Sequence, residues 1–343
     1  MSLAIITGGS GYFGSLLRDQ LRSRGRPVRV FDLVDADDRP REVEFAQGDI
    51  RDEPRVRAAC DGADTIYHCV AQVPLAKDKA LFESVNIHGT ENLLKTARRQ
   101  RVRKVIYVSS SAVFGAPKNN PVTEETMPSP AEAYGRAKHR GEMLCMDYIE
   151  AGVDTTIIRP RTIMGHGRLG IFQILFEWIR EGRNVPVLGR GDNVYQFVHA
   201  DDLADACILA AERPGPEIYN CGAEKFGTMR QVLEHLCAHA KTGSKVRSVP
   251  MAPAVALMKL TGAIGLSPLG PYHALMYGRS LYFDITKAKT ELGWKPRFSN
   301  EEMFVHSYEW YLKNRETILR TSGASHHRSA VKQGILGLVK RLL

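Results

Sequence analysis

Tyr134 and Lys138 lie four residues apart in the segment Tyr134-Gly135-Arg136-Ala137-Lys138, which has helical periodicity. On a helix this spacing places both side chains on one face. An ammonium group beside a phenol favours the phenolate, so we expect Lys138 to lower the pKa of Tyr134 toward neutrality. Such a phenol is suited to move the hydroxyl proton when a secondary alcohol and a ketone interconvert.

A run of hydroxyl side chains precedes this pair in Ser109-Ser110-Ser111-Ala112-Val113-Phe114-Gly115, directly after the apolar run Val105 to Val108. Open α/β sheets bind their ligands at the carboxyl ends of strands. We therefore expect these hydroxyls to hold a substrate oxygen beside the phenol of Tyr134. The segment lacks the GxSxG pattern of a serine hydrolase.

A glycine-rich segment near the N-terminus predicts a nucleotide site. It reads Thr7-Gly8-Gly9-Ser10-Gly11-Tyr12-Phe13-Gly14 and joins an apolar strand to a helical segment. Glycine permits the tight turn and lets the backbone approach a pyrophosphate, whose charge then lies at the helix N-terminus. The cofactor-binding residues predicted here are Gly8, Gly11, Tyr12, Phe13 and Gly14.

Asp32 ends the second predicted strand, 18 residues after Gly14. A carboxylate at this place accepts hydrogen bonds from the ribose hydroxyls of a dinucleotide. It would repel a 2′-phosphate, so NAD is favoured over NADP.

The elements that must position these residues alternate between strands and helices through the first 160 residues. This alternation predicts a doubly wound parallel α/β sheet of the Rossmann type. The predicted helices include Leu81 to Gln100 and Ala133 to Glu150, and the predicted strands are Leu3 to Ile6, Val28 to Phe31, Val43 to Ala46, Thr65 to Tyr67, Val105 to Val108 and Thr155 to Ile158.

The regular alternation of strands and helices ends after Arg159, where predicted helices mix with short strands such as Val185 to Leu188 and Glu217 to Tyr219. We predict an NAD-binding core over residues 1–160 and a smaller C-terminal α/β region over 161–318. This region mainly binds substrate, with some segments returning to the core. A basic amphipathic tail is predicted over residues 319–343.

Composition excludes several classes of protein. With 43% hydrophobic and 25% charged residues among 343, the chain is not of the disordered, fibrous or disulfide-scaffold type. Five cations and no acid lie between Arg320 and Leu343, so more than half of the net charge of +9 belongs to the tail. The remaining charge is unremarkable, and nucleic acid is not an expected partner.

The six cysteines form no CxxC pair, and no secretion signal is recognisable at Met1. We therefore expect a cytoplasmic protein with reduced thiols. The most apolar long stretch, Met251 to Gly270, contains Lys259 and two prolines and is a poor candidate for a membrane span. His235 and His239 share a helix face without the glutamate of a zinc protease, so no metal site is predicted.

Further segments accompany the glycine-rich loop and the tyrosine-lysine pair: Gly48-Asp49-Ile50, His68, Asn86 to Leu94, Arg159-Pro160, Phe197 to Leu203 and Leu292 to Pro296. With these motifs the chain resembles, over nearly its whole length, the extended short-chain dehydrogenase/reductase family. That family includes nucleotide-sugar epimerases and dehydratases and also 3β-hydroxysteroid dehydrogenase-like enzymes.

The resemblance implies roles for individual residues. Ser110, five residues before Gly115, is the hydroxyl that partners Tyr134, with Ser111 the less favoured candidate. Lys138 binds the nicotinamide ribose, while Asp49 and Ile50 flank the adenine. The implied mechanism is hydride transfer to or from the nicotinamide while Tyr134 moves the hydroxyl proton.

Two positions distinguish the branches of this family. Sugar-nucleotide enzymes usually hold the diphosphate with an asparagine and an arginine, and the aligned residues here are Thr162 and Tyr195. Arg161, Arg168 or Arg190 could supply the missing cation, so this branch stays open. The segments after Arg159 and Gly191 look more like the steroid-dehydrogenase branch. Ser111, Thr162 and Tyr195 are the predicted substrate-binding residues.

The preferred function is an NAD-dependent oxidoreductase acting on a hydrophobic sterol- or lipid-type substrate. One alternative is a nucleotide-sugar epimerase or dehydratase, and another is a cofactor-binding regulatory protein without turnover. A homodimer also stays open. Ser329 to Leu343 places its apolar side chains on one helical face with Lys340 and Arg341 away from it, which suits a membrane surface, a dimer contact or a solvated tail.

Overall fold

A computed structural model of the chain describes residues 2–72, 79–263, 276 and 278–320. Within them, seven strands form a central sheet in the order β3-β2-β1-β4-β5-β6-β11. Every neighbouring pair in this sheet is parallel. The strands are β1 (Leu3–Thr7), β2 (Val28–Asp32), β3 (Glu44–Gln47), β4 (Ala63–His68), β5 (Lys104–Val108), β6 (Thr155–Pro160) and β11 (Glu217–Cys221). The predicted doubly wound parallel sheet is confirmed.

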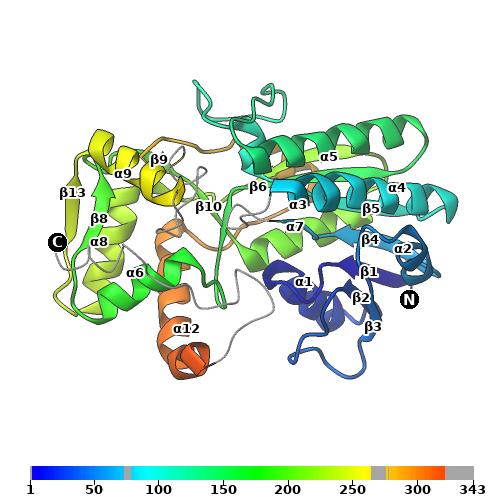
Figure 1. Cartoon of the computed structure of the whole chain (residues 1–343), viewed down its shortest axis with the longest axis horizontal. Helices are drawn as coiled ribbons and strands as arrows, with labels where there is room; N and C mark the ends of the chain where they lie inside the picture. Colours follow the sequence, from blue (N-terminus) through cyan, green and yellow to red (C-terminus); the bar gives the residue numbers. More distant parts are fainter. Residues whose placement is uncertain (1, 73–78, 264–275, 277, 321–343) are drawn as a thin grey trace.

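Helices cover both faces of the sheet, as the view in Figure 1 shows for the right-hand part of the molecule. One face is packed by α1 (Tyr12–Ser23), α7 (Ala200–Glu212) and α11 (Thr286–Leu292). The other is packed by α2 (Glu53–Ala59), α4 (Gly89–Arg99) and α5 (Ala133–Glu150). Strands buried on both sides need apolar residues along their whole length, which is why they read as continuous apolar runs in the sequence.

The helix predicted over Leu81 to Gln100 is continuous in space but changes its winding. It consists of α3 (Lys79–Glu83), a π-helical turn (Ser84–His88) and α4. The π turn contains Asn86, whose side chain accepts a hydrogen bond from the backbone N–H of Gln72 and donates one to its carbonyl. This bulge therefore fixes the segment that leaves β4, at the carboxyl edge of the sheet.

A smaller region lies beside the carboxyl edge of the sheet, at the left of Figure 1. Its helices are α6 (Ile171–Arg180), α8 (Met229–Ala240), α9 (Met251–Ala263) and α12 (Asn300–Arg320). Its strand pairs are β7 (Thr162–Met164) with β10 (Phe197–His199), β8 (Val185–Leu188) with β13 (Val246–Val249), and β9 (Val194–Tyr195) with β12 (Gly227–Thr228). The region has its own apolar core, which includes Phe176, Trp178, Phe197, Leu236 and Phe304.

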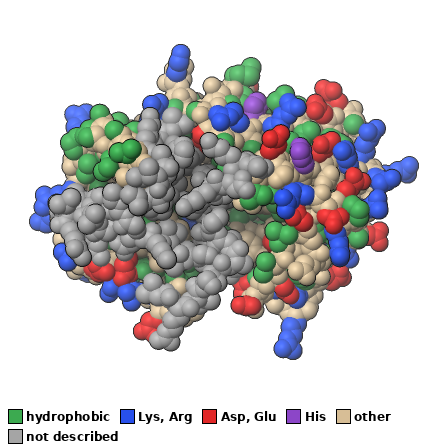
Figure 2. Space-filling model, in the orientation of Figure 1, with side chains coloured by type: hydrophobic (Ala, Val, Ile, Leu, Met, Phe, Trp, Pro, Cys, Tyr) green, Lys and Arg blue, Asp and Glu red, His purple; other side chains and the backbone are tan. Residues whose placement is uncertain are grey.

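The surface carries charges of both signs. Figure 2 shows Lys and Arg interspersed with Asp and Glu over the face of the Rossmann core. Apolar side chains gather over α9, where Met251, Leu257 and Leu260 are exposed. In the part of the chain that the structure describes, none of the helices combines the length and the apolar character needed to cross a bilayer. The helix predicted for Ser329 to Leu343 lies outside the described residues.

Candidate active site

One cavity of about 940 Å³ lies between the carboxyl edge of the sheet and the smaller region. It lies at the edge of the sheet where the strand order reverses, between β1 and β4, which is the usual ligand position in doubly wound sheets. All the predicted site residues line this one cavity: Gly8, Gly11, Tyr12, Phe13, Gly14, Asp32, Asp49, Ile50, Ser110, Ser111, Tyr134, Lys138, Thr162 and Tyr195.

The glycine-rich loop has the shape that a pyrophosphate requires. Gly8 has a φ of +76°, and a Cβ added to Gly14 would lie 2.2 Å from the carbonyl oxygen of Gly8. The first turn of α1 begins after Gly11, and no side chain caps it. Its N–H groups therefore face the cavity mouth as donors for an anion. These features fit the diphosphate of a dinucleotide.

Asp32 lies at the end of β2 beside this loop. Its carboxylate accepts hydrogen bonds from the backbone N–H of Ser10, at 3.0 Å, and of Leu33, at 2.7 Å. Burial raises the pKa of Asp32, and the backbone donors oppose that shift. The loop thus orients Asp32 toward the cavity, where its remaining lone pairs suit a ribose diol. Asp49 is held by Arg51, which lowers the pKa of its carboxyl group, and Ile50 lies next to it in the wall.

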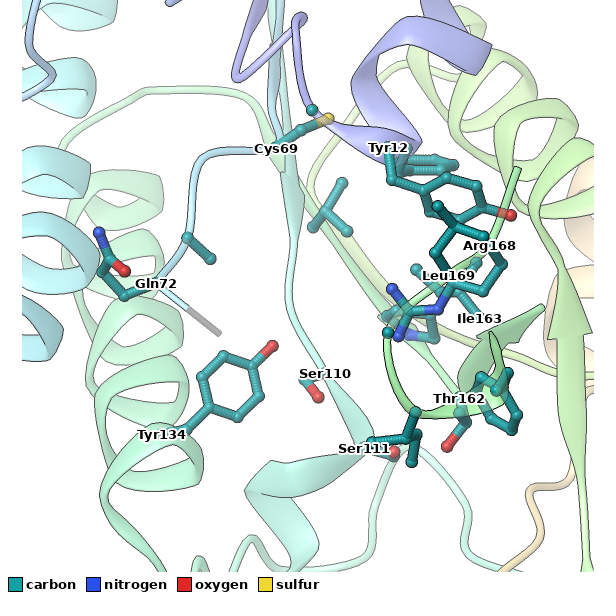
Figure 3. Close-up of a pocket in the computed structure, with 18 of the residues that line it drawn as sticks. Tyr12, Cys69, Gln72, Ser110, Ser111, Tyr134, Thr162, Ile163, Arg168 and Leu169 are labelled. Atoms are coloured by element: carbon teal, nitrogen blue, oxygen red, sulfur yellow. The ribbon is translucent and has the colours of Figure 1, made fainter. Parts of the chain in front are cut away.

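Tyr134 enters the cavity from the first turn of α5. The carboxylate of Glu132 caps this helix by accepting hydrogen bonds from the N–H groups of Tyr134 and Gly135. Ser110 leaves the end of β5, and its hydroxyl lies close enough to the phenol of Tyr134 to oppose the rise of the phenol's pKa. Figure 3 shows the phenolic oxygen pointing at Ser110, across the cavity from Ile163, Arg168 and Leu169. The predicted Ser110–Tyr134 pair is therefore assembled in space.

The pKa of Tyr134 differs from the sequence-based expectation. It is raised to about 12, because burial outweighs the opposing effects of Ser110 and Arg168. Lys138, expected to lower it, is not among the groups that shift this pKa. Its ammonium group donates instead to the carbonyl oxygen of Val108, at 2.8 Å. Burial lowers the pKa of Lys138 to about 8. At neutral pH the phenol is therefore protonated and ready to donate.

Glu142 is a buried residue beside the site that the sequence analysis missed, and its role is to join the elements that carry the site residues. It lies one turn after Lys138 on the same face of α5, is buried, and accepts a hydrogen bond from Ser109 at 2.6 Å. Arg159, at the end of β6, donates to both of its carboxylate oxygens, at 2.9 and 2.8 Å. This network joins α5 to the ends of β5 and β6. The available signal was the spacing of four residues from Lys138.

The opposite wall is built by the segment after β6 and by β9. The hydroxyl of Thr162 and the phenol of Tyr195 form a hydrogen bond of 2.9 Å. Arg190, one candidate for a replacement cation, is 88% exposed at its side chain and pairs with Asp192. It does not line the cavity, whereas Arg161 and Arg168 do. The guanidinium carbon of Arg168 lies 5.5 Å from the centre of the Tyr12 ring.

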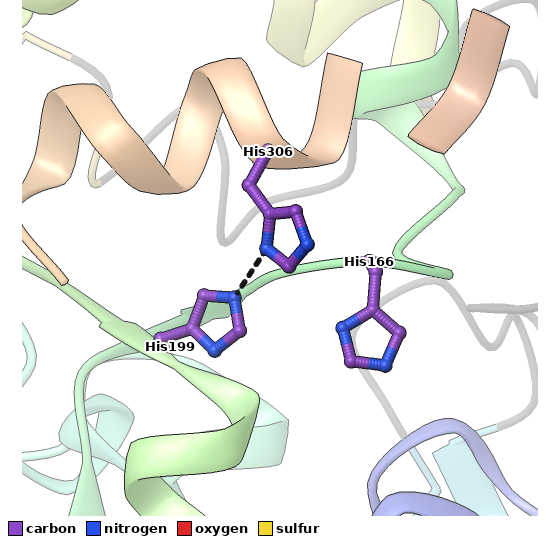
Figure 4. A group of neighbouring side chains, drawn as sticks. All are labelled: His166, His199 and His306. Atoms are coloured by element: carbon purple, nitrogen blue, oxygen red, sulfur yellow. Dashed lines mark hydrogen bonds between the residues drawn. The ribbon is translucent and has the colours of Figure 1, made fainter. Parts of the chain in front are cut away.

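Three histidines that are distant in sequence gather behind this wall, as Figure 4 shows for His166, His199 and His306. Their ligand atoms lie within 4.8 Å of one another, so a metal ion is geometrically allowed. His199 accepts the N–H of Asp201 at Nδ1, and its Nε2 is 3.0 Å from Nδ1 of His306. Burial, the first of several causes, lowers the pKa of His199 to about 3. Two imidazoles are therefore already joined by a hydrogen bond.

His68 is buried and has a packing role. Its two ring nitrogens hydrogen-bond Thr7 and Thr90 inside the core. Burial, together with the charge of Lys138, lowers its pKa to about 3, so the ring is neutral.

Comparison with known proteins gives consistent results. The model of the NAD-dependent epimerase/dehydratase family matches residues 4–222. An uncharacterised protein of Sinorhizobium fredii, y4nG, is 53% identical over 98% of this chain and 85% of its own length. A 3 beta-hydroxysteroid dehydrogenase/Delta 5→4-isomerase of Mycobacterium tuberculosis is 30% identical over 96% of this chain and 95% of its own. Among solved structures, a UDP-glucose 4-epimerase of Thermotoga maritima with UDP-glucose has a TM-score of 0.76 and 25% identity, covering 91% of this chain and 99% of that one.

Proposed function

This chain belongs to the NAD-dependent epimerase/dehydratase family, within the extended short-chain dehydrogenases/reductases, and on that premise we propose its reaction and substrate class. It is an NAD-dependent enzyme. We propose that it interconverts a secondary alcohol and a ketone on a hydrophobic substrate of sterol or lipid type. The observation that carries this proposal is the apolar wall facing Tyr134.

That wall is built by the smaller region. Its cavity-lining side chains include Ile163, Leu169, Phe172, Trp178, Met229 and Phe304. Burying apolar area contributes roughly 25 cal/mol per Å², so this wall favours an extended hydrocarbon ligand over a sugar. The hydroxysteroid dehydrogenase that resembles the chain over almost its full length also supports the steroid branch.

The chain's own residues account for the proton in this reaction. Bound NAD supplies the hydride acceptor, or NADH the donor, at the nicotinamide. The phenolic oxygen of Tyr134 points at Ser110, whose hydroxyl would hold the substrate oxygen beside it. Tyr134 gives its proton to the ketone oxygen during reduction and takes one from the alcohol during oxidation. Lys138 lines the same cavity, and the role proposed for it is to orient the ribose of the cofactor.

The alternative is a nucleotide-sugar epimerase or dehydratase, which uses the same hydride step. It is favoured by the likeness to the Thermotoga maritima structure, whose ligand is UDP-glucose. Against it stands the hydrogen bond between Thr162 and Tyr195, which uses the polar atoms at the two positions expected to hold a diphosphate. A regulatory protein without turnover is less favoured, because Ser110, Tyr134 and Lys138 are all present in the cavity.

Three further predictions from the sequence remain predictions: a cytoplasmic location, a homodimer and peripheral contact with a membrane surface. The last is supported by the exposed side chains of Met251, Leu257 and Leu260 on α9. A basic, apolar tail would add electrostatic attraction to anionic lipid.

The experiment that tests the proposed function is a comparison of substrate classes at fixed NAD concentration. We would follow absorbance at 340 nm and product chromatography with 3β-hydroxysteroids, 3-hydroxy lipids and UDP-glucose. Formation of a ketone with one equivalent of NADH from a steroid or lipid supports the proposal. Conversion of UDP-glucose without net NADH would replace it with the epimerase, and no conversion in any arm would favour the regulatory protein.

A further inference from the structure

Arg161 is a buried cation in the wall of the active-site cavity. It directly follows β6, and its backbone N–H donates to the carbonyl oxygen of Cys221 at 2.8 Å. Only 1% of the residue is exposed, although its side chain lines the cavity. A charged group held out of water needs a partner, because its desolvation otherwise costs several kcal/mol.

The contacts of Arg161 leave one edge of its guanidinium group unused. Nη1 donates to the hydroxyl of Ser111 at 2.8 Å. The ring centre of Tyr195 lies 4.5 Å from the guanidinium carbon and that of Phe283 lies 5.5 Å from it. Among the residues that the structure describes, Nε and Nη2 have no hydrogen-bond partner and no carboxylate forms an ion pair with Arg161.

The same edge holds a carboxylate in other arginines of this chain. Arg159, two residues earlier, donates from Nε and Nη2 to the two oxygens of Glu142. Arg315 uses Nε and Nη2 in the same way toward Glu177. This fork matches the spacing of two oxyanion oxygens, and it makes a charge-assisted pair of hydrogen bonds. In Arg161 the same two nitrogens are buried and have no hydrogen-bond partner among the described residues.

Arg161 is also tied to the reacting centre. Ser111, which accepts the hydrogen bond from its Nη1, is the neighbour of Ser110, and the phenolic oxygen of Tyr134 points at Ser110. Arg161, Ser110 and Tyr134 all line one cavity, so an anion held by Arg161 and the group that reacts at Tyr134 can belong to one ligand. We propose that Arg161 is a substrate subsite for a carboxylate attached close to the reacting carbon. This proposal rests on the proposed function and narrows its substrate class to hydrophobic hydroxy or keto acids.

The charge balance favours a carboxylate over a phosphate. One guanidinium group neutralises a single negative charge, and the aromatic rings around it keep the local dielectric low. A phosphate monoester carries up to two charges, so it would have to engage Arg168 of the same cavity as well as Arg161. Tyr195 and Phe283 would then act as the apolar clamp that keeps the guanidinium plane fixed.

The test measures binding, so it does not depend on turnover. Protein saturated with NADH, which cannot oxidise an alcohol, is titrated by calorimetry with 3-hydroxydecanoate, 3-hydroxydecanamide and decyl phosphate. We expect wild-type protein to bind the carboxylate at least about tenfold more tightly than the amide, as a charge-assisted bidentate pair requires. The phosphate should bind more weakly than the carboxylate.

Variants then locate the effect. Arg161→Gln should reduce the carboxylate-to-amide ratio to about one, whereas Arg190→Gln, at an exposed arginine outside the cavity, should keep it. Arg168→Gln should also keep it. Four results would overturn the proposal. In wild-type protein these are a carboxylate-to-amide ratio near one, no carboxylate binding at millimolar concentration, or tighter binding of the phosphate than of the carboxylate. The fourth is loss of the ratio in Arg168→Gln. The wild-type ratio decides the matter even where Arg161→Gln fails to fold.

The two proposals fail in different ways. Turnover of neutral steroids without carboxylate selectivity would refute the subsite and keep the oxidoreductase. Carboxylate selectivity dependent on Arg161, without NADH formation from any alcohol, would keep the subsite and refute the oxidoreductase.

Discussion

The side chains of Thr162 and Tyr195, 33 residues apart in the sequence, are hydrogen-bonded to each other across the substrate wall, with 2.9 Å between their oxygens. At the positions where a sugar-nucleotide enzyme usually presents an amide and a cation, this chain has two neutral hydroxyls that satisfy each other. A diphosphate there would lose a charge-assisted pairing and would have to break this hydrogen bond.

The first prediction follows from this pair. UDP and UDP-glucose should bind the NAD-saturated protein with dissociation constants weaker than about 1 mM, because Thr162 and Tyr195 present neutral hydroxyls that are already hydrogen-bonded to each other. Isothermal calorimetry measures this directly. Micromolar binding of UDP would show that Arg161 or Arg168 holds a diphosphate and would favour the epimerase.

The second prediction concerns pH. Burial raises the pKa of Tyr134 to about 12, so the phenol is protonated at neutral pH and the proton-accepting phenolate is scarce. Initial rates of alcohol oxidation should therefore rise about tenfold per pH unit between pH 7 and 8, while ketone reduction stays level. Rates of both directions on one alcohol and ketone pair check this. Oxidation that is independent of pH in this range would show that the phenol titrates lower.

The third prediction concerns the buried ion pair between Glu142 and Arg159. Glu142→Gln should lower the free energy of unfolding by about 3 kcal/mol or more, because it leaves the Arg159 charge buried without its counter-ion. Denaturant unfolding at pH 7 gives this value. Glu91→Gln, which breaks the exposed pair with Lys95 on α4, should cost less than about 1 kcal/mol.

This pair also has a pH signature. Although burial raises the pKa of Glu142, the neighbouring His139 side chain, the hydrogen bonds from Arg159 and Ser109 and the charge of Arg159 together hold it below the ordinary value of 4.5. A carboxyl group with a lowered folded-state pKa stabilises the protein above its unfolded pKa and loses that contribution as pH falls. The difference between wild-type and Glu142→Gln should therefore narrow below pH 4.5. A constant difference down to pH 3 would contradict this assignment.

The fourth prediction concerns cofactor choice. Wild-type protein should prefer NAD to NADP, because the carboxylate of Asp32 repels a 2′-phosphate. Asp32→Asn should reduce this preference by removing the charge. Asp32→Ala should also weaken the binding of NAD, because it removes the oxygens that accept hydrogen bonds from the ribose. The kcat/KM ratio for the two cofactors measures both effects. A wild-type preference for NADP would refute the role given to Asp32.

Local sequence signals predicted much of the site. The glycine-rich loop, Asp32 at a strand end and the spacing of Tyr134 and Lys138 each depend on neighbours within about 20 residues. Contacts between distant segments were not predictable in this way: Glu142 with Arg159, Thr162 with Tyr195, and the three histidines. The pKa of Tyr134 was expected to fall, but it rises, because desolvation depends on how deeply the finished fold buries the phenol.

The central claim is that the phenol of Tyr134 moves the proton in an NAD-dependent oxidation or reduction. Tyr134→Phe keeps the ring and removes only the hydroxyl, and Tyr148→Phe is its control, a phenol on the same helix outside the cavity. The decisive measurement pairs kcat on a hydroxysteroid or hydroxy lipid with the dissociation constant of NADH for each variant. The account predicts that Tyr134→Phe lowers kcat by about 10²-fold or more with NADH affinity nearly unchanged, while Tyr148→Phe stays close to wild type. Near-normal turnover by Tyr134→Phe would contradict it.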